Sequence, residues 1–150
     1  MSSARQKQVS GTIDIAAEPK AIFAILTNPH EHHRIDGSGT IGAVVEGPET
    51  LMLGSEFGMK VQRKRFGYST RNKVVEYEKD RLIAWKHKAP HRWRYELTSL
   101  ADGKTRVVET FDYSGYGPFS IFMSPMAKHN KRSIDATLVR LKDVIEERPR

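Results

Sequence analysis

The side chains best suited to chemistry lie near the end of the last predicted strand, residues 105–114, which carries Glu109 and Asp112. Side chains alternate across a strand, so only one of these two carboxyl groups can face the interior of the protein. Burial raises the pKa of a carboxyl group toward neutrality, which suits general acid/base catalysis. If Glu109 faces inward it is the first catalytic candidate, with the phenols of Tyr95 and Tyr113 as further candidates.

The register of this strand decides which acid faces inward, and the sequence leaves two registers open. Phe111 and Tyr113 share the face of Glu109, so inward aromatic rings would bury that acid as well. A two-residue turn at residues 102–103 would instead bring Asp112 inside.

A buried Glu109 itself has two interpretations. It can move protons, or it can be neutralised in an ion pair with Arg94 or Arg71. From the sequence alone the ion pair is the preferred interpretation.

A second set of side chains, aromatic and sulfur-containing, could line a binding site. On the predicted strand 92–100, Trp93 and Tyr95 share one face while Arg92 and Arg94 share the other, so the aromatic rings point inward. Core packing explains any single member, but as a group these side chains suit a ligand, because buried Trp and Tyr need polar partners and Met adapts its shape. The expected ligand-binding residues are Trp85, Trp93, Tyr95, Phe111, Tyr113, Phe122, Met123, Met126, Asn130 and Ile134.

One polar residue, Asn130, interrupts the apolar stripe of a long helix predicted over Pro125–Glu147. The stripe recurs at spacings of three and four residues, the period of an amphipathic helix. An unpaired buried amide costs about 1–3 kcal/mol. Asn130 must therefore bond to Tyr95, to water or to a ligand, and the sequence leaves these alternatives open.

One sheet and one long helix must position these side chains. Alternation predicts a first strand at Val9–Ile15, and Pro19 begins a short helix that Asn28-Pro29 ends. Six further strands separated by turns are predicted over residues 40–46, 55–62, 68–78, 81–86, 92–100 and 105–114. Ser124 is a suitable N-cap for the long helix. The order predicts an α+β fold in which a curved antiparallel meander packs against a single long helix.

The net charge of +7 is concentrated in loops that the meander places together. Alternate connections of a meander lie at one end, so the turn at 63–67, the connection at 86–92 and the segment 115–124 should be adjacent. We expect Arg63, Arg65 and Arg92 at the mouth of a cavity there. A solvated rim is the simpler interpretation, but cations around an apolar mouth also suit a ligand with an anionic head group or contact with an acidic membrane. No nucleic acid is expected, because the aromatic rings point away from the outward arginines.

The composition limits the remaining possibilities. The 150 residues suffice for one domain with a real core, and 38% hydrophobic with 29% charged residues is ordinary for a soluble globular protein. The longest apolar run, Ala21–Leu26, is too short for a membrane span, the N-terminus lacks a signal-peptide core, and no cysteine is present. We therefore expect one domain over residues 1–150, located in the cytoplasm. The run His30–His33 with Asp36 is expected to be a solvated surface turn, and no metal or cofactor is expected.

Several short motifs stand at corresponding places in a known superfamily. They are Asn28-Pro29, Ile35–Gly39, Trp93-Arg94-Tyr95 and Thr105–Asp112. With these motifs the chain resembles the SRPBCC superfamily over roughly residues 8–147. Within that superfamily it is similar to small bacterial proteins labelled polyketide cyclase/dehydrase-like, relatives of START lipid-transfer domains and birch-pollen-type allergens.

The resemblance implies a helix-grip fold: a curved seven-stranded antiparallel sheet wrapped around a long C-terminal helix, with two short helices between the first two strands. It also implies a hydrophobic or amphipathic ligand, a lipid or a polyketide-like molecule, between sheet and helix, without fixing a reaction. The leading expectation is therefore a non-enzymatic binding or carrier protein, monomeric or homodimeric. The alternatives are a cyclase/dehydratase-type enzyme that uses Glu109, Tyr95 or Tyr113, and a basic module that interacts with RNA or protein.

Overall fold

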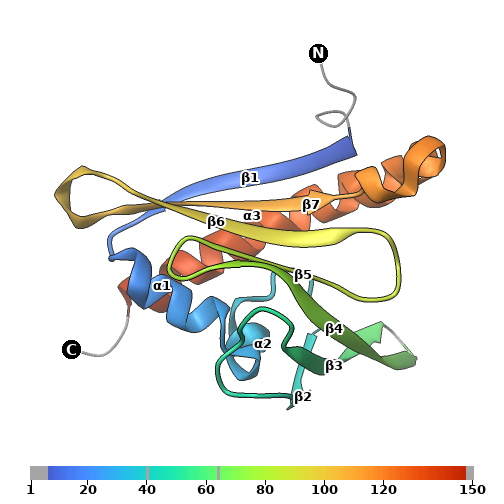
Figure 1. Ribbon diagram of the computed structural model, residues 1–150, viewed down its shortest axis with the longest axis horizontal. Helices are drawn as coiled ribbons and strands as arrows, with labels where there is room; N and C mark the ends of the chain where they lie inside the picture. The colour runs from blue at the N-terminus through green and yellow to red at the C-terminus, as the bar shows by residue number, and fades with distance from the viewer. Residues whose placement is uncertain (1–6, 40, 64, 148–150) are drawn as a thin grey trace.

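A curved antiparallel sheet and one long helix dominate the computed structural model, which describes residues 7–39, 41–63 and 65–147 (Figure 1). The predicted α+β class is confirmed. The strands are β1 (Gln8–Ile15), β2 (Ile41–Glu46), β3 (Glu56–Arg63), β4 (Phe66–Glu78), β5 (Leu82–Lys86), β6 (Arg92–Ser99) and β7 (Thr105–Asp112). The helices are α1 (Pro19–Leu26), α2 (His32–Ile35) and α3 (Ser124–Glu146), with 3-10 turns η2 (Pro29–Glu31), η3 (Ala101–Gly103) and η4 (Ser114–Met123).

The strands follow one another as a meander, and β1 closes the order by pairing with β7 to give β1-β7-β6-β5-β4-β3-β2. The β4–β5 register shifts between Val74 and Glu76. Such an irregularity bends a strand and helps a sheet curve. In Figure 1 the β3–β4 hairpin, the β5–β6 connection and η4 lie at one end of the molecule, at the right. The predicted grouping of these three connections is confirmed.

Helix α3 packs across β1 and β7, and its buried stripe includes Ile134, Leu138 and Leu141. Two glycines allow α3 to lie close to β1 and to the segment that follows α2. A Cβ on Gly11 of β1 would lie 2.8 Å from Ile134 Cγ2, and one on Gly37, after α2, would lie 2.4 Å from the backbone nitrogen of Thr137. The helix is therefore clamped between the sheet and the segment that follows α2.

The helix ends differ slightly from the prediction. Pro19 stands in the first turn of α1 as expected, and the side chain of Asn28 accepts a 3.0 Å hydrogen bond from the His30 backbone nitrogen. Ser124, predicted as the N-cap of α3, is instead its first residue, because η4 runs directly into the helix and puts Met123 at the cap. None of the described helices combines the length and apolar character needed to cross a membrane.

Candidate functional site

A cavity of about 470 Å³ lies between the inner face of the sheet and helices α2 and α3. Three of its lining side chains are also exposed, Tyr68 on β4 and Met126 and His129 on α3, so the cavity opens between β4 and the start of α3. Of the residues expected to bind a ligand, those that line the cavity are Trp85, Trp93, Tyr95, Phe111, Met126, Asn130 and Ile134.

Three other expected residues lie outside this lining. Tyr113 is buried and stacks on Phe111 with ring centroids 5.7 Å apart, so its ring contributes to the core. Met123 packs against the edge of the core, and Phe122 is 77% exposed. Phe122 leaves the cavity because it belongs to the 3-10 segment η4, whose side chains do not continue the stripe of α3.

The three arginines expected at the mouth of the cavity do not lie together. Arg65 is exposed in the β3–β4 turn, close to Tyr68 in sequence, whereas the side chain of Arg63 lies outside the described residues. The predicted position of Arg92 at the mouth of the cavity is wrong. Its guanidinium bonds to Glu76 at 2.7 Å on the outer face of the sheet, because β6 side chains alternate and Trp93 takes the inner face.

The β6–β7 connection decides which acid enters the cavity. The backbone nitrogen of Leu100 donates to the carbonyl of Lys104 at 2.8 Å, which leaves a turn of three residues, 101–103, between the paired strands. Asp102 and Gly103 are in left-handed conformations (φ 65° and 73°). The register therefore pairs Tyr95 with Glu109. A two-residue turn would have shifted the register by one residue and reversed every side chain of β7. Glu109 lines the cavity, and the alternative with Asp112 inside is wrong.

The carboxyl group of Glu109 is 4% exposed, and its Oε1 has no hydrogen-bond partner among the described residues. Burial raises its pKa to about 8. A hydrogen bond from Tyr95 opposes this shift, while the charges of Asp36 and Asp135 add to it. Glu109 is consequently a neutral acid at pH 7.

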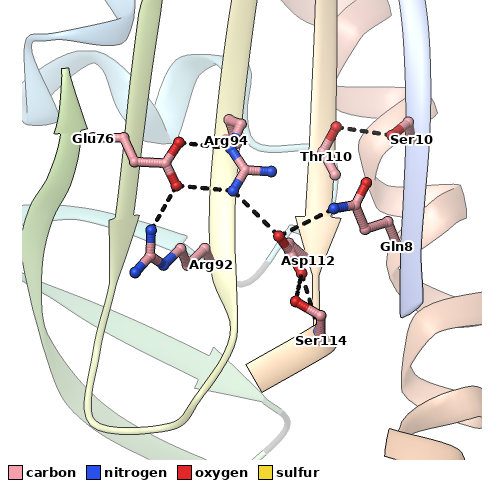
Figure 2. A network of polar contacts seen from close by, with 8 residues as sticks. All are labelled: Gln8, Ser10, Glu76, Arg92, Arg94, Thr110, Asp112 and Ser114. Carbon is pink, nitrogen blue, oxygen red and sulfur yellow. Dashed lines mark hydrogen bonds and ion pairs between the residues drawn. The ribbon is translucent and has the colours of Figure 1, made fainter. Parts of the chain in front are cut away.

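The preferred ion pair of Glu109 with an arginine is wrong. Figure 2 shows Arg94 on the outer face, where it bonds to Glu76 at 2.8 Å and to Asp112 at 3.2 Å. Arg71 pairs with Glu56 at 3.0 Å. Both arginines lie on the face opposite Tyr95 and Glu109, so the sheet itself separates them from the cavity.

Sequence reasoning missed a buried histidine at the inner wall. His32 was expected in a solvated turn, but it is buried, stacks on Trp85 with centroids 5.0 Å apart, and bonds through Nε2 to the carbonyl of Leu26 at 2.9 Å. Burial lowers its pKa to about 4. Its spacing from Pro29 and Ile35, both buried, is the signal that could have placed it on an inward helical face.

A second missed group stands near the opening. His91 bonds through Nδ1 to the Tyr116 hydroxyl at 2.9 Å and so ties the β5–β6 connection to η4. Its ring also packs on Phe111. Burial, followed by the charges of His87 and Lys86, lowers its pKa to about 4. Both His32 and His91 are therefore neutral at pH 7.

Besides Asp36, whose charge acts on Glu109, the inner part of the cavity presents uncharged hydrogen-bonding groups. Asn130 lines it from α3, and no hydrogen bond joins its amide to Tyr95. Among the residues described, no Lys or Arg side chain lines the cavity, and no group of three or more His, Asp or Glu side chains is arranged to hold a metal ion. The site can bind an apolar molecule and donate hydrogen bonds to it.

Comparison with known proteins gives one family and several solved structures that share this fold. The model of the family described as "Polyketide cyclase / dehydrase and lipid transport" matches residues 6–146. The uncharacterised protein Rv0088 of Mycobacterium tuberculosis is 36% identical over 141 residues, which are 91% of this chain but only 63% of that protein. The solution structure of KanY protein is 19% identical, with a TM-score of 0.70 over 93% of this chain and 97% of that one. A protein from Arthrobacter aurescens is 14% identical, with a TM-score of 0.76 over 99% and 91%.

Proposed function

Since the chain belongs to the polyketide cyclase/dehydrase and lipid transport family, we propose that it binds or carries a hydrophobic or amphipathic small molecule between the sheet and α3. The observation that carries this proposal is the cavity of about 470 Å³ with its aromatic wall. That volume lies in the range of small-molecule sites, and such sites combine apolar walls with a few placed polar groups. The proposal includes a helix-grip fold formed as one domain over about residues 8–147. It also places the protein in the cytoplasm.

Extraction of the purified protein without detergent, followed by mass spectrometry, tests this proposal. We expect an apolar molecule to be recovered from the native protein. Trp93→Ala should lower its retention, because Trp93 forms part of the wall. Val139→Ala, a change on the exposed side of α3, is the matched control and should retain it. A protein that neither contains nor takes up an apolar molecule would contradict the proposal.

One observation favours a second candidate, an enzyme of the cyclase/dehydratase type. Glu109 has a raised pKa, a free oxygen and a phenol beside it, and no arginine neutralises it. An acid of this kind is suited to proton transfer near neutral pH. Removal of a proton from the carbon next to a ketone would transfer that proton to the ionised carboxylate and leave an enolate, which takes up a solvent-derived deuteron in D2O.

Deuterium exchange at the methyl group of 2-acetylnaphthalene, followed by NMR in D2O, tests this candidate. The wild-type protein should accelerate the exchange, more strongly as the pH rises through about 8 and Glu109 ionises. Glu109→Gln should abolish the acceleration. Equal exchange rates with wild type and variant would favour the carrier.

We also propose that the opening faces an acidic membrane. Phe119, Ile121 and Phe122 of η4 are 66%, 70% and 77% exposed. Residues 113–134 contain no Asp or Glu but do contain Lys128, Lys131 and Arg132. Apolar side chains within a cationic surface suit the interface of an anionic bilayer, which would present an apolar ligand to the cavity.

A further inference from the structure

The inner wall of the cavity contains a buried oxygen, Oε1 of Glu109, for which the described part of the chain provides no hydrogen-bond partner. Unpartnered buried polar atoms are rare, because each loses its hydrogen bonds with water and gains none in return. The residues beside Glu109 on the neighbouring strands provide no further hydrogen-bond partner for this oxygen. Its cross-strand neighbour on β1 is Gly11, which has no side chain, and its neighbour on β6 is Tyr95.

The charges around this oxygen disfavour an anionic ligand. Asp36 lines the same cavity, and Asp36 and Asp135 both act electrostatically on Glu109. Four histidines line the cavity. Burial lowers the pKa of His32, of His87 and of His91, and His129 is exposed at the opening. No Lys or Arg of the described residues lines the cavity, so a carboxylate or phosphate at the inner end would be desolvated without a counter-charge.

The same environment makes Glu109 a hydrogen-bond donor. A protonated carboxyl has one O–H donor and keeps acceptor capacity on its other oxygen. That acceptor can receive the Tyr95 hydroxyl, which leaves the acid proton for a molecule in the cavity. An acid kept neutral by an apolar site is an effective donor to a carbonyl oxygen.

We propose that the inner end of the cavity recognises a neutral hydrogen-bond acceptor, a ketone or similar carbonyl oxygen of an otherwise apolar ligand, through the carboxylic acid proton of Glu109. This inference rests on the proposed function and specifies its ligand. An anionic group, if a ligand carries one, must lie at the opening.

A matched pair of probes tests the proposal, 2-acetylnaphthalene and 2-naphthoate, which share a ring system and differ in charge. Binding is measured by tryptophan fluorescence, since Trp85 and Trp93 line the cavity. At pH 6.5 we expect the ketone to bind about tenfold more tightly than the carboxylate. The ketone affinity should fall as the pH rises through about 8, because ionised Glu109 can no longer donate.

Three variants separate the role of the proton from that of packing. Glu109→Gln keeps a donor without titrating, so it should bind the ketone with an affinity that no longer changes with pH. Glu109→Leu should lose about tenfold in ketone affinity. Glu96→Gln, on the exposed face of β6, should behave as wild type. Circular dichroism verifies that each variant is folded.

The outcomes distinguish this inference from the proposed function. Equal binding of both probes, or tighter binding of the carboxylate, would overturn the inference and leave a binding cavity intact. Unchanged ketone affinity in Glu109→Leu would do the same. If neither probe binds wild type and extraction recovers no apolar molecule, the proposed function fails and this inference fails with it.

Discussion

At Glu109 a single carboxyl group couples the stability of the protein to its chemistry. The folded state keeps this acid protonated up to a pH of about 8, whereas in an unfolded chain a glutamate ionises near 4.3. Between these values unfolding releases a proton. The free energy of unfolding therefore falls as the pH rises through this window, and the loss is complete above about 8.

Glu109→Gln should remove this loss. At pH 4 the variant and the wild type should unfold at similar temperatures, because Glu109 is protonated in the folded state and mostly protonated in the unfolded chain. At pH 8.5 the variant should be more stable, with a rise in Tm on the order of 10 °C. Thermal unfolding followed by circular dichroism over this pH range measures the difference. A variant no more stable than the wild type at pH 8.5 would show that a partner stabilises ionised Glu109 in the folded protein.

The two neutral histidines, His32 and His91, make the free energy of unfolding rise with pH, opposite to the effect of Glu109. Burial lowers the pKa of His32 and of His91 to about 4, below the value near 6.5 of an unfolded chain. Their contribution to stability is thus complete above pH 6.5 and is lost as the pH falls toward 4. NMR titration of the imidazole signals should show half-protonation of both rings near pH 4, and near 6.5 for the chain unfolded in urea. Titration of either ring near 6.5 in the folded protein would contradict the described burial.

On the outer face of the sheet, a network of ion pairs connects the strands β4, β6 and β7. Arg94 bridges Glu76 and Asp112, and its side chain is 15% exposed (Figure 2). Gln8 of β1 extends the network through its amide, which donates to Asp112 at 3.1 Å. The inner face is thereby left free for the aromatic side chains and Glu109.

Arg94→Met should destabilise the protein by about 2 kcal/mol, because it removes the cation that bonds to two partly buried carboxylates, Glu76 and Asp112. The matched control is Arg106→Met, which removes a pair with Asp14 that also spans two strands but in which Arg106 is 50% exposed. Exposed pairs contribute less, because solvent screens the two charges. Urea unfolding at pH 7 compares the two variants. Equal losses would show that burial does not set the strength of this network.

For the whole molecule, the distribution of charge and apolar surface distinguishes the two ends. The end that carries the opening has exposed phenylalanines in η4 and cations nearby, without acids over residues 113–134. A different exposed apolar pair, Met52 and Leu53, lies in the loop between β2 and β3. The two surfaces allow a controlled test of the membrane proposal.

Vesicle co-sedimentation should detect binding to phosphatidylglycerol-rich membranes and little binding to pure phosphatidylcholine. Phe119→Ser with Phe122→Ser should reduce binding by about tenfold or more, since two exposed aromatic side chains are removed. Met52→Ser with Leu53→Ser should leave it unchanged, and 0.5 M salt should weaken it. A concentration-dependent dimer that the phenylalanine substitutions dissociate, without any vesicle binding, would identify a second copy as the partner of this surface.

The sequence by itself determined the elements and the inward set of aromatic residues, because strand and helix periodicity is a local property. The alternation that placed Trp93 and Tyr95 inward and Arg94 outward predicted one wall of the cavity correctly. The tertiary structure decided the rest. One additional residue in the β6–β7 turn turned Glu109 inward, and the length of a turn cannot be obtained from the composition of the strands it joins. Packing of α2 against β5 buried His32, and the 3-10 path of η4 exposed Phe122, because both depend on contacts between segments far apart in the chain.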